Sequence, residues 1–132
     1  MAIREILTAP HEVLRKKAKK VTNFDADFQQ TVEDMIETMH DAPGTGLAAT
    51  QIGLLQRLIV VEYPKDDEVE DSPLKLYVVA NPEIVESSDE KEMGIEGCLS
   101  VPGLVGEVER NLRIVVKGQN RQGKNVKLKL EN

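Results

Sequence analysis

The stretch Gly94-Ile95-Glu96-Gly97-Cys98-Leu99-Ser100-Val101-Pro102 carries the only cysteine of the 132-residue sequence, set between glycines and a proline. Glycine allows unusual backbone angles and close approach of a ligand, and proline fixes the backbone, so the stretch predicts a shaped turn. A second glycine-rich stretch, Gly44-Thr45-Gly46-Leu47-Ala48-Ala49-Thr50-Gln51, precedes it. We expect the two stretches to form one wall of a functional site whose remaining parts the sequence does not contain.

An amphipathic helix is predicted ahead of both stretches. Its apolar residues recur at helical spacing and form one stripe: Phe28, Val32, Met35, Ile36 and Met39. Asn23 or Asp25 is a suitable N-cap, and Pro43-Gly44 ends the helix. A further turn or two of helix is expected within residues 11–20.

The remainder reads as strands. Residues 57–63, 74–80, 83–88, 104–108, 112–117 and 126–130 are expected to be extended, with Asn81-Pro82 closing the second. Residues 47–52 suit a packed strand or turn, 64–73 an acidic surface loop, and 119–124 a hairpin turn. We therefore predict a single α+β domain over residues 1–132, with an N-terminal helix packed on mainly antiparallel strands.

Charge and hydropathy exclude several classes of protein. The formal net charge of −6 argues against binding to a phosphate backbone, so no nucleic-acid partner is expected. No apolar run approaches the roughly 20 residues that span a bilayer, and the first residues do not resemble a secretory signal. A lone cysteine fits a reducing compartment or a thiol kept for its chemistry. These features predict a cytoplasmic protein without a membrane contact.

Three interpretations of Cys98 remain open from the residues alone. It could be a small buried hydrophobic residue, a nucleophile, or a metal ligand. A nucleophile needs a histidine partner, and a metal centre needs further protein ligands. The sequence offers only His40, interpreted as structural, and His11, interpreted as a surface residue, and no histidine or cysteine follows Cys98. A redox-sensing thiol is a weaker fourth hypothesis.

The earlier glycine-rich stretch is equally ambiguous by itself. Gly44 and Gly46 are typical of a tight turn, and they lack the spacing of a phosphate-binding loop. Gln51 carries a neutral amide that could donate to an oxyanion, or it could be an ordinary surface or strand-edge amide.

Taken together, the two stretches resemble the peptide deformylase family. The first is similar to that family's G-x-G-L-A-A-x-Q motif and the second to its E-G-C-L-S motif. The segments 10–21 and 120–124 also resemble the family's N-terminal segment and late hairpin, so the resemblance covers essentially the whole chain. It implies a metal-dependent hydrolase that removes the N-formyl group from the initiator methionine of nascent proteins.

The resemblance implies a role for each matched residue. Cys98 would be a thiolate ligand to a divalent metal, iron in the family, with zinc or nickel as alternatives. The Gln51 side chain and the Leu99 backbone N–H would stabilise the oxyanion, because neutral donors can be preorganised without desolvating a charge. The residues expected to bind the formyl-methionyl peptide are Gly44, Thr45, Gly46, Glu96, Gly103, Leu104 and Arg110.

The sequence departs from the family pattern in one large respect. The family's H-E-x-x-H helix, which supplies two histidine ligands and the catalytic glutamate, has no counterpart in this sequence. We therefore expect a C-terminally truncated chain that lacks the central metal-binding helix, binds metal weakly or not at all, and is inactive. An exposed core could pair two copies in a homodimer. The alternative is a non-catalytic peptide-binding or regulatory module on the same fold.

Overall fold

Helix α1 (Ala26–Asp41) is the only α-helix in the described part of the computed structural model, residues 2–64 and 73–131. Asp25 is its N-cap, accepting a hydrogen bond from the Phe28 N–H at 3.0 Å. The predicted stripe faces inward, and Val32, Met35 and Met39 are fully buried. The helix prediction is confirmed. The predicted turn before it is the 3-10 helix η1 (Glu12–Arg15).

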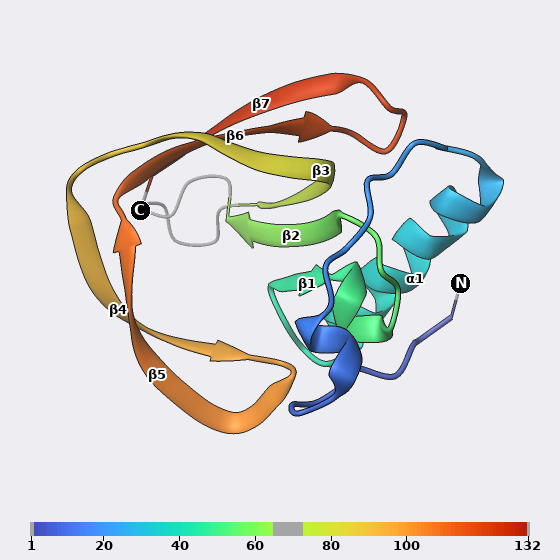
Figure 1. The fold of residues 1–132 in the computed structure, drawn as a ribbon, viewed down its shortest axis with the longest axis horizontal. Helices are drawn as coiled ribbons and strands as arrows, with labels where there is room; N and C mark the ends of the chain where they lie inside the picture. The colour runs from blue at the N-terminus through green and yellow to red at the C-terminus, as the bar shows by residue number, and fades with distance from the viewer. Residues whose placement is uncertain (1, 65–72, 132) are drawn as a thin grey trace.

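Seven strands and a second 3-10 helix complete the described fold, which is α+β as predicted (Figure 1). They are β1 (Gly46–Ala48), η2 (Ala49–Ile52), β2 (Leu58–Pro64), β3 (Leu74–Ser87), β4 (Lys91–Cys98), β5 (Val101–Asn111), β6 (Arg113–Gln119) and β7 (Asn125–Glu131). Five form an antiparallel sheet in the order β1-β2-β3-β6-β7, and β4 and β5 form a separate two-stranded sheet. Most of the predicted acidic loop lies outside the described residues.

The prediction that Asn81-Pro82 closes a strand is wrong, because β3 runs through both residues. Asn81 adopts a left-handed backbone conformation with φ 53°, which asparagine tolerates better than most residues. Its side chain accepts from the Val21 N–H at 2.7 Å and donates to the Val21 carbonyl at 2.9 Å. The strand therefore shifts register at Asn81 and continues beside β6 instead of ending.

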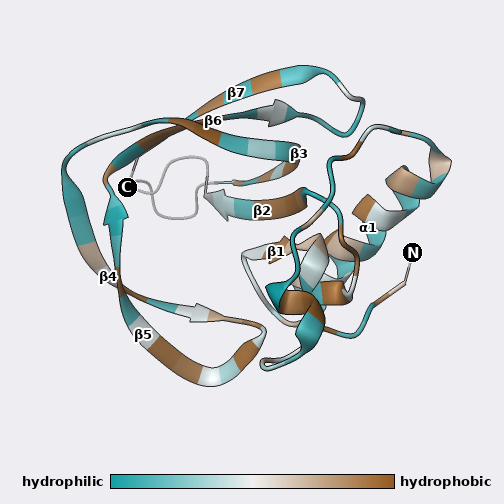
Figure 2. Ribbon diagram, in the orientation of Figure 1, coloured by the Kyte–Doolittle hydropathy of each residue, from teal (hydrophilic) through white to brown (hydrophobic). Residues whose placement is uncertain are grey.

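The core lies between α1 and the β1-η2-β2 segment. Its buried members include Met35, Leu47, Leu58 and Val60. The β4–β5 hairpin projects away from this core, and the turn that joins its two strands lies near η1 and β1 (Figure 1). Hydrophobic positions nevertheless occur on this hairpin as well as in the core (Figure 2). No helix in residues 2–64 and 73–131 has the length and hydrophobicity of a membrane span.

Candidate active site

A cavity of about 800 Å³ joins the two glycine-rich stretches. Gly44, Thr45, Gly46 and Gln51 line it together with residues 97–99 and 101–105. The sequence prediction that these stretches share one wall therefore corresponds to a real concavity.

Gly44 allows the two stretches to approach closely. A Cβ added at position 44 would lie 2.8 Å from Cδ1 of Leu99, which is closer than carbon atoms pack. Leu99 occupies the turn between β4 and β5 and packs against the core. The missing side chain at position 44 thus makes room for the residue that follows Cys98.

The N-terminal segment also connects the two glycine-rich stretches through hydrogen bonds. The Leu7 N–H donates to the Gln51 carbonyl, and the Ala9 N–H donates to the Ser100 carbonyl, both at 2.7 Å. The beginning of the same segment is fixed to α1, because the Ala2 N–H and the Arg4 guanidinium both donate to the buried Asp34 carboxylate. Residues 2–9 therefore connect the helix, η2 and the β4–β5 turn.

Gln51 and Cys98 meet inside this cavity. Nε2 of Gln51 donates a hydrogen bond to Sγ of Cys98 at 3.6 Å, a distance that suits the large sulfur atom. Cys98 is the last residue of β4 and is exposed, so its thiol is accessible. The interpretation of Cys98 as a buried hydrophobic residue is therefore wrong. An accessible thiol beside a neutral amide donor can offer a ligand atom and an oxyanion donor to one bound group.

Free strand edges border the cavity. Within residues 2–64 and 73–131, β1 is the edge strand of the five-stranded sheet and pairs only with β2, and β5 pairs with β4 in the hairpin. Gly46 on β1 and residues 101–105 on β5 both line the cavity. Edge strands expose backbone N–H and C=O groups, so an extended peptide could bind between them by strand addition.

Glu96 and Arg110 are placed differently from the other predicted site residues. They form a bidentate ion pair at 2.8 and 3.0 Å across the hairpin and are not among the residues that line the cavity. The Arg110 guanidinium holds the pKa of the Glu96 carboxyl below its usual value. Their assignment to substrate binding stays a prediction, and the observed geometry gives them a role in bracing the hairpin.

The two histidines lie away from the cavity. His11 caps η1 by accepting from the Val13 N–H, and His40 contacts the Glu62 carboxylate at 3.2 Å. Among the described residues, no three His, Cys, Asp or Glu side chains form a group that could hold a metal ion.

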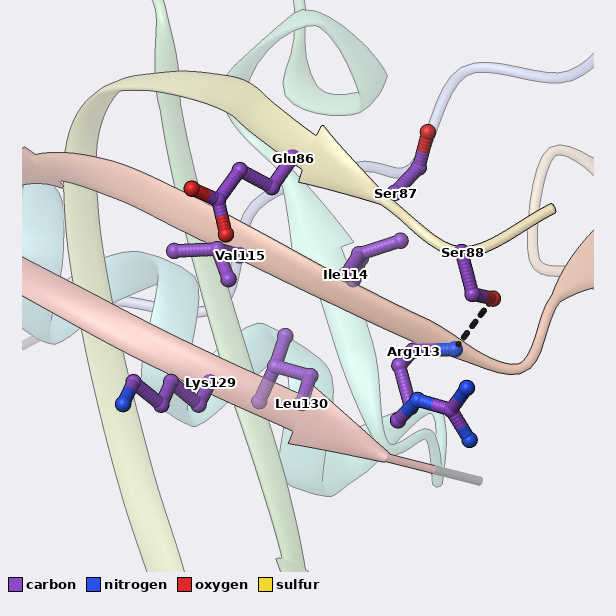
Figure 3. A pocket seen from close by; sticks show the side chains of 8 residues that line it. All are labelled: Glu86, Ser87, Ser88, Arg113, Ile114, Val115, Lys129 and Leu130. Carbon is purple, nitrogen blue, oxygen red and sulfur yellow. Dashed lines mark hydrogen bonds between the residues drawn. The ribbon is translucent and has the colours of Figure 1, made fainter.

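A second cavity, of about 500 Å³, opens between β3, β6 and β7 (Figure 3). Ile114, Val115 and Leu130 provide its apolar lining, and the Arg113 N–H donates to Ser88 Oγ at 3.1 Å. The cavity that contains Cys98 and Gln51 is the candidate site because it brings the thiol and an amide donor together.

Comparisons with known proteins identify the family of the chain. The sequence model of the polypeptide deformylase family matches residues 3–132. The chain belongs to the polypeptide deformylase family. Peptide deformylase from Natranaerobius thermophilus is 47% identical over 122 residues, which are 92% of this chain and 73% of that relative. The peptide deformylase of Symbiobacterium thermophilum is 48% identical over 96% of this chain and 55% of its own length.

Solved deformylase structures share the fold. Peptide deformylase from Ehrlichia chaffeensis in complex with actinonin superposes with a TM-score of 0.92 at 36% identity, covering 100% of this chain and 77% of that one. The Thermotoga maritima enzyme gives a TM-score of 0.88 at 42% identity, covering 100% and 84%. The deformylase resemblance that the two motifs indicated is confirmed.

Sequence reasoning missed the residues that hold Gln51 in place. Ala48 and Ser100 bind its side chain, and Leu7 binds its backbone. Ser100 was visible within the cysteine stretch, but nothing in its spacing indicated a partner 49 residues away. Backbone donors such as those of Leu7 and Ala48 leave no signal in side-chain composition.

Proposed function

We propose that this chain forms the thiolate and oxyanion-donor side of a deformylase site that binds the formyl-methionyl end of nascent peptides. The observation that carries the proposal is the 3.6 Å contact between Gln51 Nε2 and Cys98 Sγ. The contact lies in a cavity bordered by two edge strands. It supports a site in which one amide and one sulfur approach the same bound group.

The residues of this chain then have separate tasks. The Gln51 amide and the Leu99 N–H donate to the oxygen of the formyl group as negative charge develops on it. Backbone groups of Gly46 and of Gly103 and Leu104 pair with the peptide, which aligns its formylated end with the amide. Gly44 and Thr45 shape the cavity wall beside them.

Deformylases use a divalent metal, and a metal held beside Cys98 would supply Lewis-acid chemistry to the site. Iron, zinc and nickel all accept a thiolate ligand, and Cys98 offers one. The described residues bring no second and third ligand beside it, so they do not fit a complete metal centre. The chain by itself is therefore proposed to bind metal weakly and to be inactive.

The test compares this chain with one extended at its C-terminus by a segment that carries an H-E-x-x-H sequence. Both are assayed for hydrolysis of an N-formyl-methionyl peptide, and their bound metal is measured. We expect stoichiometric metal and activity only in the extended chain, and loss of both when Cys98→Ala is introduced. Activity of the extended chain that survives Cys98→Ala would contradict the proposal.

A non-catalytic peptide-binding module is the second candidate. It is favoured by the contrast between an intact cavity and the absence of a ligand group among the described residues. Titration of the metal-free chain with N-formyl-methionyl peptide tests it. Saturable binding without hydrolysis supports this function, and no binding at millimolar peptide contradicts it.

Self-association is proposed from the aliphatic surface of the strands. Several large hydrophobic side chains are exposed, among them Leu74, Ile84, Met93, Ile95, Leu104 and Val105. Exposed apolar area of this kind favours association between copies. We expect sedimentation to show a dimer of the cytoplasmic protein at micromolar concentration. A monomer at all concentrations would contradict this part of the proposal.

A further inference from the structure

The side chain of Gln51 is held at both ends. Its Oε1 accepts a hydrogen bond from the Ala48 N–H at 2.9 Å, and its Nε2 donates to Ser100 Oγ at 3.1 Å. Nε2 also lies 3.6 Å from Cys98 Sγ. Three groups from two separate segments therefore surround one amide.

The direction of each hydrogen bond follows from the chemistry of the partners. The Ala48 N–H can only donate, so it must face the oxygen of the amide and not its NH₂ group. The NH₂ group is consequently turned toward Ser100 and Cys98. Because an amide nitrogen only donates, the Ser100 hydroxyl must act as its acceptor. The Ala48 N–H therefore excludes the flipped orientation, which would present the amide oxygen to a bound oxyanion.

The Ser100 hydroxyl is itself fixed in position. Ser100 is 4% exposed, and its carbonyl accepts from the Ala9 N–H at 2.7 Å. The lining of the cavity includes Cys98 and Leu99 and resumes at Val101, so Ser100 lies behind the wall. Its hydroxyl therefore reaches the cavity through the Gln51 amide, to which it is hydrogen-bonded.

We propose that Ser100 is a positioning residue that engages one Nε2 proton of Gln51 and thereby directs the other toward the space beside Cys98 Sγ. That second proton is the one available to a formyl oxygen, so the inference rests on the proposed function for its consequence. The geometry of the amide itself does not depend on that function. The buried Ser100 hydroxyl thus orients the Gln51 amide, which is the group that contacts the substrate.

The first experiment measures the Gln51 side-chain amide by ¹⁵N NMR in the metal-free chain. In the unmodified chain we expect the Nε2 protons to exchange slowly with water. Ser100→Ala should accelerate this exchange several-fold, and Ser100→Thr, which keeps a hydroxyl, should restore slow exchange. Ser87→Ala, at an exposed serine on β3, is the matched control. Unchanged exchange and chemical shifts in a folded Ser100→Ala variant would overturn the proposal.

The second experiment separates positioning from general stability. The same variants are titrated with an N-formyl-methionyl peptide and with its unformylated counterpart. Loss of one aligned hydrogen bond predicts that Ser100→Ala weakens formyl-peptide binding by about 3- to 10-fold and leaves the other peptide unaffected. Equal weakening of both peptides would contradict a positioning role. If the unmodified chain binds neither peptide, the proposed function fails, and the amide exchange still decides the role of Ser100.

Discussion

The α1 half of the molecule and the β4–β5 hairpin are built in opposite ways. Around α1, β1 and β2 the aliphatic side chains are excluded from water, whereas every residue of β4 is exposed. Burial therefore stabilises the first region, and the second depends on backbone pairing and on its attachments to the rest. Cys98 lies where they meet, at the end of β4 beside Gln51. The buried region around α1, β1 and β2 therefore positions the Gln51 amide, and the exposed β4–β5 hairpin carries the Cys98 sulfur.

The largest difference is expected between equivalent truncations in the two regions. Met35→Ala, at a fully buried position, should lower the free energy of unfolding by about 2–5 kcal/mol because it leaves a cavity. Ile95→Ala, at a side chain that is 73% exposed in the single chain, should change it by less than about 0.5 kcal/mol at concentrations where the chain is monomeric. Urea unfolding of both variants provides the measurement. A large and concentration-dependent cost for Ile95→Ala would show that the hairpin is buried in an assembly.

Substitution of Asp34 tests how the N-terminal segment is attached to α1. Asp34 is 2% exposed and accepts hydrogen bonds from Ala2, Arg4 and Gln30. Its pKa is lowered although burial alone would raise it, because these bonds outweigh the desolvation. Asp34→Asn should cost about 2–3 kcal/mol at pH 7, since a partly exposed Arg4 and other donors lose their partner.

The pH dependence of this effect has a definite sign. The ionised carboxylate favours folding, so its contribution is complete above the pKa in the unfolded chain and is lost as the pH falls toward the lower pKa of the folded chain. The free energy of unfolding of the unmodified chain, measured at pH 7, 5 and 3, should therefore fall toward that of the Asp34→Asn variant as the pH is lowered. A constant difference across this range would contradict the assignment.

Substituting one glycine in each region tests how tightly its backbone is packed. A Cβ at Gly118 of β6 would lie 2.7 Å from the Ala80 carbonyl oxygen and from Val79, so Gly118→Ala should cost about 1–3 kcal/mol. The control is Gly106 of β5, where a Cβ would meet nothing within 4 Å. Gly106→Ala should be neutral or slightly stabilising in thermal unfolding. Equal costs would mean that β5 is packed as tightly as β6.

The smallest effect is expected at the hairpin's own ion pair. Arg110→Ala should let the pKa of Glu96 rise to its usual range, because the guanidinium is the main cause of its depression. Carbon NMR of the glutamate carboxyl follows this titration. Global stability should hardly change, since surface ion pairs contribute little. A Glu96 titration that does not respond would show that the pair is open in solution.

The sequence predicted most of the fold because its signals were local. Helical periodicity located α1, alternation located β7, and Asp25 was one of the two N-caps considered. The continuity of β3 was missed because Asn81-Pro82 normally interrupts a strand. Whether it does so here depends on Val21, a residue distant in the sequence.

The sequence indicated which residues belong to the candidate site, but not how they are arranged in space. The glycine-rich stretches indicated Gln51 and Cys98 as a pair, and the cavity brings them together. Glu96 and Arg110 belong to the same resemblance, yet they bind each other across the hairpin. Strand register decides which side chains of a motif reach a cavity, and local composition does not encode that register.

We propose that Cys98 and Gln51 face the space in which a formylated peptide end binds. Because Cys98 is the only cysteine, its rate of alkylation by a thiol reagent reports on that space alone. We predict that saturating N-formyl-methionyl peptide slows alkylation of the metal-free chain and that an unformylated peptide slows it less. An alkylation rate that the formyl peptide leaves unchanged, at a concentration where binding is independently observed, would contradict the account.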